Sequence, residues 1–581
     1  MSAGRTLFIV AAALPSLLGA QTAPGIPSDW RYTGKAAFAP TAMVASSNRH
    51  AAAAGLEILK AGGNAVDAAV ATGFALAVSY PEAGNLGGGG YMVIRMADGR
   101  TAALDYRETA PAAAWRNMYV DSSGVITNHS INGRSASGVP AAVAGLLAAH
   151  AKFGVLPLAQ VMAPAIRLAE GMIVDSALER SVNGAREKIA QYAGAEVFLR
   201  DGKAPVAGSR IVQADLAATL KAVASQGPKG FYRGKIAQLI VDEMNRDCPA
   251  GVPVRARGWH GCGLITLKDL ADYKPAWRAP VETHFRGYSL LSMSPSSSGG
   301  TIVGEALNIL DGYPSLPSFG SARYVHLVAS AFQRAFIDRN ELMGDPDFVK
   351  VPVAMMAGAS RAAMWRATID STHKTPTRTL MNNRREGMET TQYSVVDKWG
   401  NAVANTTTIN ALYGSGVFVK GAGFFMNNTM DDFASQPGTP NMFGLVQGEA
   451  NAIAPRKRAL SAMSPTIVLD PQGKLFMVLG ARGGPRIITS TAQVILNVIA
   501  NHMSLTDAVN APRIHHQALP DTLRTDIGGF YPAVTAQLEQ MGWILQPQGY
   551  IGGSVVAIKR ARGGWEGMDD SRGFGGAAVG Y

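Results

Sequence analysis

Threonine hydroxyls gather in one short stretch of this sequence, where two β-branched segments flank a Gly-Asn tip. Thr390 and Thr391 open the first segment, and residues 406–408 are threonines near the end of the second. Such arms predict a hairpin with strands over 391–396 and 402–409. A hydroxyl at its start is a weak nucleophile at neutral pH and needs an adjacent base. Threonine-rich strands are also common where no chemistry takes place, so the hairpin alone leaves both interpretations open.

A pair of carboxylates and a pair of glycines follow the hairpin. Asp431 and Asp432 come after the apolar run 421–426. Paired acids occur in glycosidases and metal sites, but neighbours in an extended chain point to opposite sides, so we expect one acid to face inward. Gly483 and Gly484 stand between a predicted strand and a predicted helix. Such a turn exposes backbone N–H groups, which an oxyanion hole requires.

Two further motifs argue against a cofactor and a metal ion. The four glycines at 87–90 predict a turn that leads into a strand over 92–96. They lack the Gly-Lys-Ser/Thr ending of a P-loop and the helix that follows a dinucleotide fingerprint. His515 and His516 are neighbours, which rarely share one ion, and no third ligand is close in the sequence, so we interpret them as structural. The sequence therefore predicts no cofactor and no metal.

The overall composition is that of an ordinary globular protein, with 47% of 581 residues hydrophobic and 16% charged. No linker, charge block or internal repeat divides the chain, so we expect one large unit. The formal charge of +11 is spread thinly. The chain has no basic arm with interleaved aromatic residues, so nucleic-acid binding is disfavoured. A weaker alternative is that the positive charge attracts small anionic substrates.

The amino-terminal residues indicate export. Residues 1–20 combine a single arginine, a short apolar run and small residues, which is typical of a cleaved secretory signal. No later stretch reaches 18 uncharged apolar residues, so we expect no membrane span and a periplasmic or secreted protein. Cys248 and Cys262 are the only cysteines. A local disulfide fits an exported protein, and the sequence leaves its formation open.

Periodicity predicts most of the remaining elements. The serine-rich run 291–301 is interpreted as a strand end and a helix cap. The polar and basic stretch 371–388 is expected to be a flexible leader, and 436–459 a long loop. Apolar residues at helical spacing predict helices within 43–78 and over 140–151, 158–170, 213–226, 234–245 and 322–339.

Taken together, these motifs resemble the gamma-glutamyltransferases, N-terminal nucleophile hydrolases that are made as one chain and cut themselves. The similarity runs from about Met43 to the carboxyl end. It is carried by the hairpin from Thr390, the Asn-Leu-Gly-Gly-Gly-Gly run at 85–90, the Asp-x-Arg-Glu-x-Ala-Pro segment at 105–111, and the segments around Asp432, Ser461 and Gly483.

The resemblance implies an α+β fold, a four-layer αββα sandwich, and self-processing. Residues 1–20 are then the signal peptide, 21–389 the large subunit and 390–581 the small subunit, and the two subunits stay associated as a heterodimer in one intertwined globular unit. The cut lies between Glu389 and Thr390. The freed α-amine of Thr390, with an unperturbed pKa of about 7.7 to 8.0, is a base within reach of the same residue's hydroxyl.

The resemblance also implies roles for single residues. Arg107 grips the α-carboxylate of the substrate, since a planar guanidinium meets both oxygens, and Asp432 with Asn410 binds the α-ammonium. The implied catalytic residues are the nucleophile Thr390, its orienting neighbour Thr408, and the oxyanion-hole pair Gly483 and Gly484. The implied substrate-binding positions are Arg107, Asn410, Thr429, Asp432, Ser461 and Ala462.

Three positions depart from the family's pattern. Thr429 stands where glutamine or glutamate is often found, and Ala462 replaces the second serine of a Ser-Ser pair. Phe443 replaces an aromatic hydroxyl in the loop that resembles the family's lid over the glutamyl pocket. The first two departures each remove about one hydrogen bond to the head group, about 0.5 to 1.5 kcal/mol. We expect catalysis to survive these losses.

The function that follows from the resemblance is γ-glutamyl transfer and hydrolysis, in which glutathione and related compounds are cleaved through a γ-glutamyl-threonine intermediate. Acceptors are amino acids, peptides or water, and no acceptor motif is evident. The alternatives are a glutaryl or cephalosporin acylase of the same fold and an unprocessed exported protein that binds an amino acid. A glutaryl donor lacks the α-ammonium and would leave Asp432 unpaired, which costs several kcal/mol and favours the γ-glutamyl donor.

Overall fold

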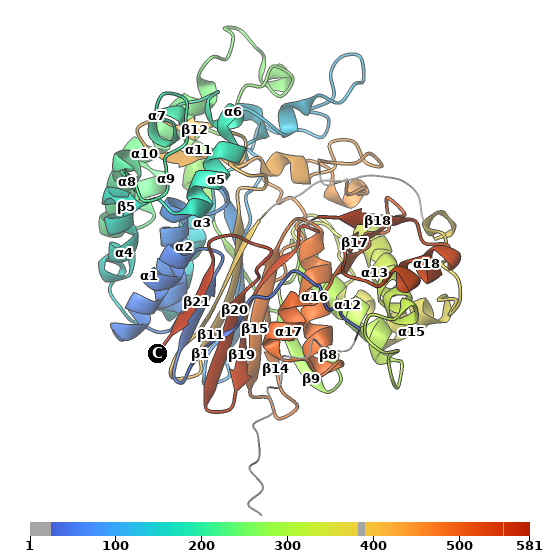
Figure 1. Ribbon diagram of the computed structural model, residues 1–581. Helices are drawn as coiled ribbons and strands as arrows, with labels where there is room; N and C mark the ends of the chain where they lie inside the picture. Colours follow the sequence, from blue (N-terminus) through green and yellow to red (C-terminus); the bar gives the residue numbers. More distant parts are fainter. Residues whose placement is uncertain (1–24, 381–389, 443, 550) are drawn as a thin grey trace, which may run out of the picture.

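Two seven-stranded β-sheets form the centre of the protein (Figure 1). The computed structural model describes residues 25–380 and 390–581, apart from 443 and 550. In spatial order the first sheet contains β1 (Ala37–Ala39), β20 (Gly564–Asp569), β19 (Ser554–Ala561), β15 (Leu475–Arg482), β14 (Thr466–Leu469), β9 (Tyr288–Ser292) and β8 (Val281–Phe285). The second contains β21 (Ala577–Gly580), β2 (Met43–Ser46), β10 (Thr391–Val396), β11 (Ala402–Thr408), β3 (Gly89–Arg95), β4 (Thr101–Tyr106) and β7 (Ala276–Arg278).

The two sheets pack face to face, with β10 and β11 lying against β15. The contact is close at Gly480 of β15, where the Cβ of any other residue would lie 2.5 Å from Gln392 Oε1 of β10. Every neighbouring pair of strands in the two sheets is antiparallel. The strand that starts at Thr391 is therefore a central strand whose two faces are both covered.

Helices cover the outer face of each sheet and complete four layers (Figure 1). All 15 residues of α2 are buried, because small side chains let it pack between the second sheet and neighbouring helices. The second sheet is covered by α1 (Arg49–Lys60), α2 (Ala65–Ser79) and α3 (Ala142–Phe153), with α4 (Leu158–Glu170) packed on α1 and α2. The first is covered by α12 (Gly299–Asp311) and α16 (Arg486–Ile499), with α13 (Ala322–Leu342) packed on α12. The predicted α+β, four-layer αββα sandwich is confirmed.

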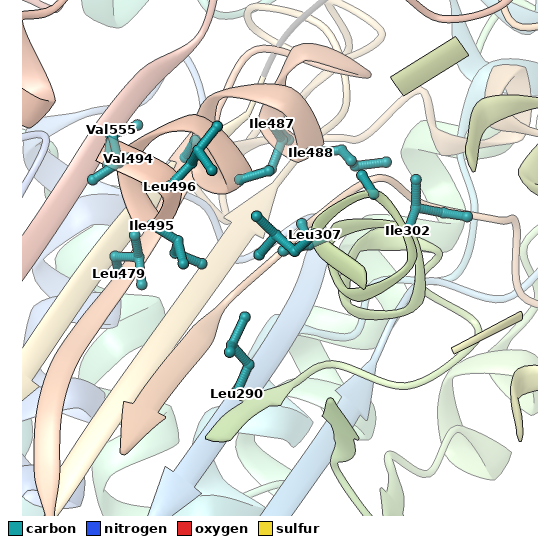
Figure 2. Packing of buried hydrophobic residues seen from close by; sticks show 14 of the residues in the cluster. Leu290, Ile302, Leu307, Leu479, Ile487, Ile488, Val494, Ile495, Leu496 and Val555 are labelled. Atoms are coloured by element: carbon teal, nitrogen blue, oxygen red, sulfur yellow. The ribbon is translucent and has the colours of Figure 1, made fainter. Parts of the chain in front are cut away.

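Apolar side chains fix the helices to the sheets. Figure 2 shows Ile488 of α16 and Leu307 of α12 gathered with Leu479 of β15 and Leu290 of β9. Each of these four side chains is at most 1% exposed. Burying one such side chain contributes about 1.5 to 3 kcal/mol, so this cluster holds α16 firmly against the end of β15.

The other elements are short or lie outside the four layers. The further helices are α5 (Ser176–Gly184), α6 (Arg186–Ile189), α7 (Ala195–Phe198), α8 (Ala214–Gln226), α9 (Lys229–Tyr232), α10 (Gly234–Asn245), α11 (Leu267–Asp272), α14 (Val353–Met356), α15 (Ala359–Ala367), α17 (Leu505–Asn510) and α18 (Pro532–Gln540). The further strands are β5 (Met172–Ile173), β6 (Arg210–Ile211), β12 (Phe418–Val419), β13 (Phe424–Phe425), β16 (Ile514–His515), β17 (Leu523–Asp526) and β18 (Leu545–Gln548).

The threonine-rich hairpin forms as predicted and ends one residue early, at Thr408. Its register pairs Thr391 with Thr407. The tip is closed by Asp397, whose Oδ1 accepts from the backbone N–H of Trp399 at 2.9 Å and of Asn401 at 3.0 Å. The hairpin is therefore fixed at its tip, and its open end is free to present side chains at the end of the sandwich.

Two local predictions were wrong. Residues 43–46 form strand β2 rather than the start of a helix, and helix α1 begins only after its N-cap residue Asn48. Gly89 and Gly90 belong to β3 rather than to a turn. A Cβ at either glycine would lie 2.4 Å from a carbonyl oxygen of a neighbouring strand, so close packing of strands explains these glycines.

The helix predictions agree closely with the structure, whereas the predicted cap does not form. Helices α4 and α10 have the predicted bounds, α3 and α8 begin one or two residues late, and α13 extends three residues further, to Leu342. Ser298 precedes α12 without a capping hydrogen bond, and its hydroxyl donates instead to Ser461 O at 2.6 Å. A tertiary contact has replaced the local one.

Cys248 and Cys262 form a disulfide with their Cα atoms 5.3 Å apart. The proposed signal segment and the second part of the expected leader, residues 381–388, lie outside the described residues. Within the described ranges, no helix is both long and apolar enough to cross a membrane.

Candidate active site

A small cavity of about 20 Å³ lies at the end of the sandwich where β10 begins and β11 and β15 end. Loops from both halves of the sequence meet the two sheets there. The sequence-predicted site residues in its lining are Arg107, Thr390, Thr408, Asn410, Asp432, Ser461, Ala462 and Gly484. The fold thus brings eight of the ten predicted catalytic and binding residues to one place.

Thr390 and Thr408 lie at the open end of the hairpin. Since Thr391 pairs with Thr407, the next pair outward in register is Thr390 with Thr408. Thr390 is only 5% exposed. Thr408 Oγ1 accepts the backbone N–H of Asn410 at 2.8 Å. Asn410 has a φ of 75°, a left-handed conformation that asparagine tolerates better than most residues. The turn after β11 therefore holds both side chains at the cavity.

Arg107 and Asp432 form a buried ion pair across the cavity, with Arg107 Nη2 in contact with Asp432 Oδ2. Arg107 Nη1 also lies 3.3 Å from Glu108 Oε2. Burial alone would lower the pKa of Arg107, but Glu108 and Asp432 raise it above its ordinary value. Burial raises the pKa of Asp432 to about 6, although Arg107 opposes this shift. A fixed cation and an anion that is charged at neutral pH therefore face each other beside Thr390.

The turn after β15 holds two backbone donors. Gly483 has a φ of 122° and Gly484 a φ of 57°. A Cβ at Gly483 would lie 1.6 Å from Gly552 O, so only glycine fits there. Among the described parts of the chain, the N–H groups of the two glycines have no hydrogen-bond acceptor. Gly484 lines the cavity and Gly483 adjoins it, which leaves these donors available to an oxyanion.

Thr429 and Asp431 lie behind the cavity lining. Thr429 Oγ1 donates to Glu108 Oε1 at 2.7 Å, so Thr429 reaches the site only through the carboxylate beside Arg107. Asp431 accepts from Ser130 Oγ at 2.7 Å and from a backbone N–H at 3.0 Å. The two neighbouring acids have separate partners, as expected. They stand on a 3₁₀ turn rather than on extended chain, however, which corrects the predicted backbone.

Arg339 lines the cavity and was not singled out from the sequence. It lies near the end of α13, is fully buried, and its Nε donates to Ser298 Oγ at 2.9 Å. Burial lowers its pKa to about 10, and nearby Asp432 opposes that shift. The sequence did hold a signal, because an arginine on the apolar face of a long helix requires a partner in the core.

The remaining candidates lie elsewhere. Glu389 and Phe443 are outside the described residues. His515 is buried, with Nδ1 2.9 Å from Thr489 Oγ1 and Nε2 2.8 Å from Gln517 Oε1. In the part of the chain that the structure describes, no three His, Cys, Asp or Glu side chains are placed to hold a metal ion. The histidine pair is therefore accounted for by packing and hydrogen bonds.

The arrangement is suited to acyl transfer. The Thr390 hydroxyl can act as a nucleophile, and the backbone N–H groups of the turn after β15 can stabilise a negatively charged oxygen. The Arg107–Asp432 pair can bind a ligand that carries both a negative and a positive charge. Because Arg107 and Asp432 are in contact and the cavity is small, a ligand has to separate this ion pair and contact each partner itself.

Comparisons with known proteins agree with this chemistry. The family model described as gamma-glutamyltranspeptidase matches residues 51–580. The glutathione hydrolase proenzyme of Escherichia coli (strain K12) is 42% identical over 547 residues, which cover 93% of this chain and 92% of the relative. The acylase ACY 1 proenzyme of Pseudomonas sp. (strain SE83) is 39% identical and covers 84% of each chain. The crystal structure of Helicobacter pylori gamma-glutamyltranspeptidase superposes with a TM-score of 0.53 at 39% identity, covering 60% of this chain and 95% of that one.

Proposed function

The chain belongs to the gamma-glutamyltranspeptidase family, and we propose that its γ-glutamyl transfer and hydrolysis proceed on Thr390 after cleavage of the bond before it. It is a gamma-glutamyltransferase and glutathione hydrolase, and the alternative of a binding protein without chemistry is set aside. The observation that carries the proposal is the Arg107–Asp432 pair in the same cavity as Thr390.

Maturation is the first use of the Thr390 hydroxyl. The hydroxyl attacks the carbonyl carbon of Glu389, the peptide C–N bond breaks, and the resulting ester is opened by water. The products are a large subunit of residues 21–389 and a small subunit of 390–581, which stay together as a heterodimer. The Helicobacter pylori chain supports this division, since it maps onto 60% of this chain, and residues 21–389 are about 64% of it (369 of 581).

Turnover uses the same hydroxyl with a new base. The freed α-amine of Thr390 takes the hydroxyl proton while Oγ attacks the γ-carbonyl carbon of the donor. The N–H groups of Gly483 and Gly484 stabilise the negative oxygen. The C–N bond of the amide then breaks, and the leaving amine takes the proton from the α-amine. Water or the amine of an acceptor attacks the γ-glutamyl ester, which restores the hydroxyl.

The head group of the donor replaces the ion pair in the small cavity. Its α-carboxylate binds Arg107 and its α-ammonium binds Asp432, so one buried ion pair is exchanged for two. A glutaryl group offers only the carboxylate and leaves Asp432 buried without a partner, at a cost of several kcal/mol. This difference favours a γ-glutamyl donor over the glutaryl donor of the acylase alternative, although an acylase relative is 39% identical.

Thr429 and Ala462 have different consequences for the donor. Because Thr429 hydrogen-bonds Glu108 behind the cavity, it acts on Arg107 indirectly rather than on the head group. Ala462 lines the cavity and offers no donor, so Ser461 beside it supplies the remaining hydroxyl. In so small a cavity, water-exposed polar groups do not replace the hydrogen bond that Ala462 cannot make, so we expect the head group to bind more weakly.

Export completes the proposal. Residues 1–20 have the composition of a cleaved signal, and the Cys248–Cys262 disulfide suits an oxidising compartment. The experiment that tests the proposed function compares kcat/KM of the purified enzyme for γ-glutamyl-anilide and for glutaryl-anilide. We expect a clear preference for γ-glutamyl, and an equal or better rate with glutaryl would replace it by the acylase function.

A further inference from the structure

A second and much larger cavity, of about 880 Å³, opens beside the first. We call it the arginine cavity, because four guanidinium groups line it and Glu82 is the one carboxylate in its lining among the described residues. It lies between α5, the end of β15 and the carboxyl-terminal segment. Its four arginines are Arg31, Arg180, Arg482 and Arg572.

The two cavities share a wall. Leu412 and Arg482 line the arginine cavity, whereas Asn410 and Gly484 line the small one. Leu412 is two residues after Asn410 in the sequence, and Arg482 is two residues before Gly484. Because consecutive Cα atoms lie about 3.8 Å apart, the Cα atoms that line the two cavities lie at most about 8 Å apart at both places. A ligand held at the oxyanion turn is therefore close to the chain segments that line the arginine cavity.

Arg31 and Arg180 have no carboxylate within 4.0 Å among the described residues, and of the two Arg31 donates to Gly549 O whereas no protein acceptor is found for Arg180. Arg572 is buried and pairs with Asp526 at 2.8 Å and Asp570 at 3.3 Å. Arg482 lies 3.8 Å from Glu82. The guanidinium of Arg180, by contrast, lies 4.3 Å from the centre of an aromatic ring, that of Phe574.

The contact with Phe574 holds Arg180 at the cavity wall without using its N–H donors. A cation over an aromatic face gains about 0.5 to 1 kcal/mol at an exposed site. The planar donors stay available to a carboxylate, which they can meet with two parallel hydrogen bonds. Arg572 is already balanced by Asp526 and Asp570. The other three arginines of the lining still outnumber Glu82, so an anion is favoured there.

We propose that the arginine cavity binds the carboxylate of the peptide part of the reaction, with Arg180 as its main partner. This inference rests on the proposed function. With the γ-glutamyl group in the small cavity, the cysteinylglycine portion of glutathione projects over the shared wall. Two extended residues span about 7 Å, which is comparable to the spacing of the Cα atoms that line the two cavities. A dipeptide acceptor that attacks the ester places its own carboxylate in the same position.

The test compares substrates that do and do not carry this carboxylate. For Arg180→Ala, the ratio of kcat/KM for glutathione to kcat/KM for γ-glutamyl-anilide falls about tenfold, as expected for a lost hydrogen bond between charged groups. A second arm uses glycylglycine and glycylglycinamide as acceptors, and the preference for glycylglycine falls by a similar factor. The donor arm reports on the leaving group and the acceptor arm on the acceptor, and a fall in either supports the proposal.

Arg233→Ala is the matched control. Arg233 is also exposed, but it lines a cavity that shares no lining residue with the arginine cavity or the small cavity, so both ratios stay at their wild-type values. Arg180→Lys recovers part of each ratio because it restores the charge without the planar fork. Ratios for Arg180→Ala that stay within twofold of wild type in both arms overturn the inference. A wild-type enzyme that cleaves no γ-glutamyl donor overturns the proposed function instead.

Discussion

Asp432→Asn removes the negative charge of the buried pair and keeps the shape of the side chain. In the proposed binding mode the α-ammonium of the donor pairs with Asp432, and in the variant it is buried against a neutral amide. Removing one partner of a buried ion pair costs about 3 to 5 kcal/mol. A loss of about 3 kcal/mol in the transition state corresponds to a fall of about 100-fold or more in kcat/KM for γ-glutamyl-anilide.

Glutaryl-anilide responds in the opposite sense. It has no ammonium group, so Asp432 is an unpaired buried charge when this substrate is bound, and the amide of Asp432→Asn removes that cost. The two rates change in opposite directions, so the ratio of kcat/KM for γ-glutamyl-anilide to that for glutaryl-anilide should fall by at least about 100-fold, more than either rate changes alone. Both rates are measured on the mature fraction, with cleavage checked on a gel.

Asp431→Asn is the matched control for this experiment. Asp431 is the neighbouring buried acid, and burial also raises its pKa to about 6, but its partners are Ser130 and a backbone N–H rather than the cavity. Its substitution should change the ratio by less than about threefold. If the two variants shift the ratio equally, or if Asp432→Asn leaves it unchanged, the assignment of Asp432 to the α-ammonium is refuted.

Three further predictions concern pH, the oxyanion turn and the disulfide. Because the pKa of Asp432 is raised to about 6, its carboxylate is protonated as pH falls through that value and no longer binds the ammonium. In a plot of log kcat/KM for γ-glutamyl-anilide against pH, the slope should therefore increase from one, set by the α-amine, towards two. Asp432→Asn should keep the slope of one. Gly483→Ala places a Cβ 1.6 Å from Gly552 O at a φ of 122°, so kcat of the cleaved enzyme should fall about 10²- to 10³-fold; a fall under threefold would exclude the turn as the oxyanion site. Reduction of Cys248–Cys262, which are 14 residues apart, should destabilise the fold by about 3 kcal/mol and lower Tm, and an unchanged melting curve would show that the bond does not support the fold.

The parts of the fold with strong local periodicity were predictable from the sequence. The hairpin strand from Thr391 and helices α4 and α10 have the predicted bounds, because apolar spacing and turn residues agree there. The glycines at 89–90 were misread, since a glycine required by a neighbouring strand looks in the sequence like a glycine required by a turn. Only tertiary contact distinguishes these two uses.

The site residues that the family resemblance supplied could be predicted from the sequence. Those that tertiary packing brings to the site could not. Arg339 reaches the cavity from a helix whose pattern indicates only a buried face, and no spacing rule connects it to Asp432. Thr429 was expected at the head group but faces Glu108, because a one-turn 3₁₀ segment rotates its side chain behind the cavity. The arginine cavity is assembled from segments between residues 31 and 574, which no local motif could join.

The most direct test of the central claim examines Thr390 itself. The purified protein is separated on a denaturing gel, the smaller band is sequenced from its amino terminus, and the enzyme is treated with an electrophilic glutamine analogue before peptide mass mapping. We expect a 192-residue small subunit that begins with Thr390 (residues 390–581) and one covalent adduct on that residue, with neither product from Thr390→Ala. A folded, active enzyme that remains one intact chain, or an adduct on another residue, would contradict the claim that Thr390 is both the new amino terminus and the nucleophile.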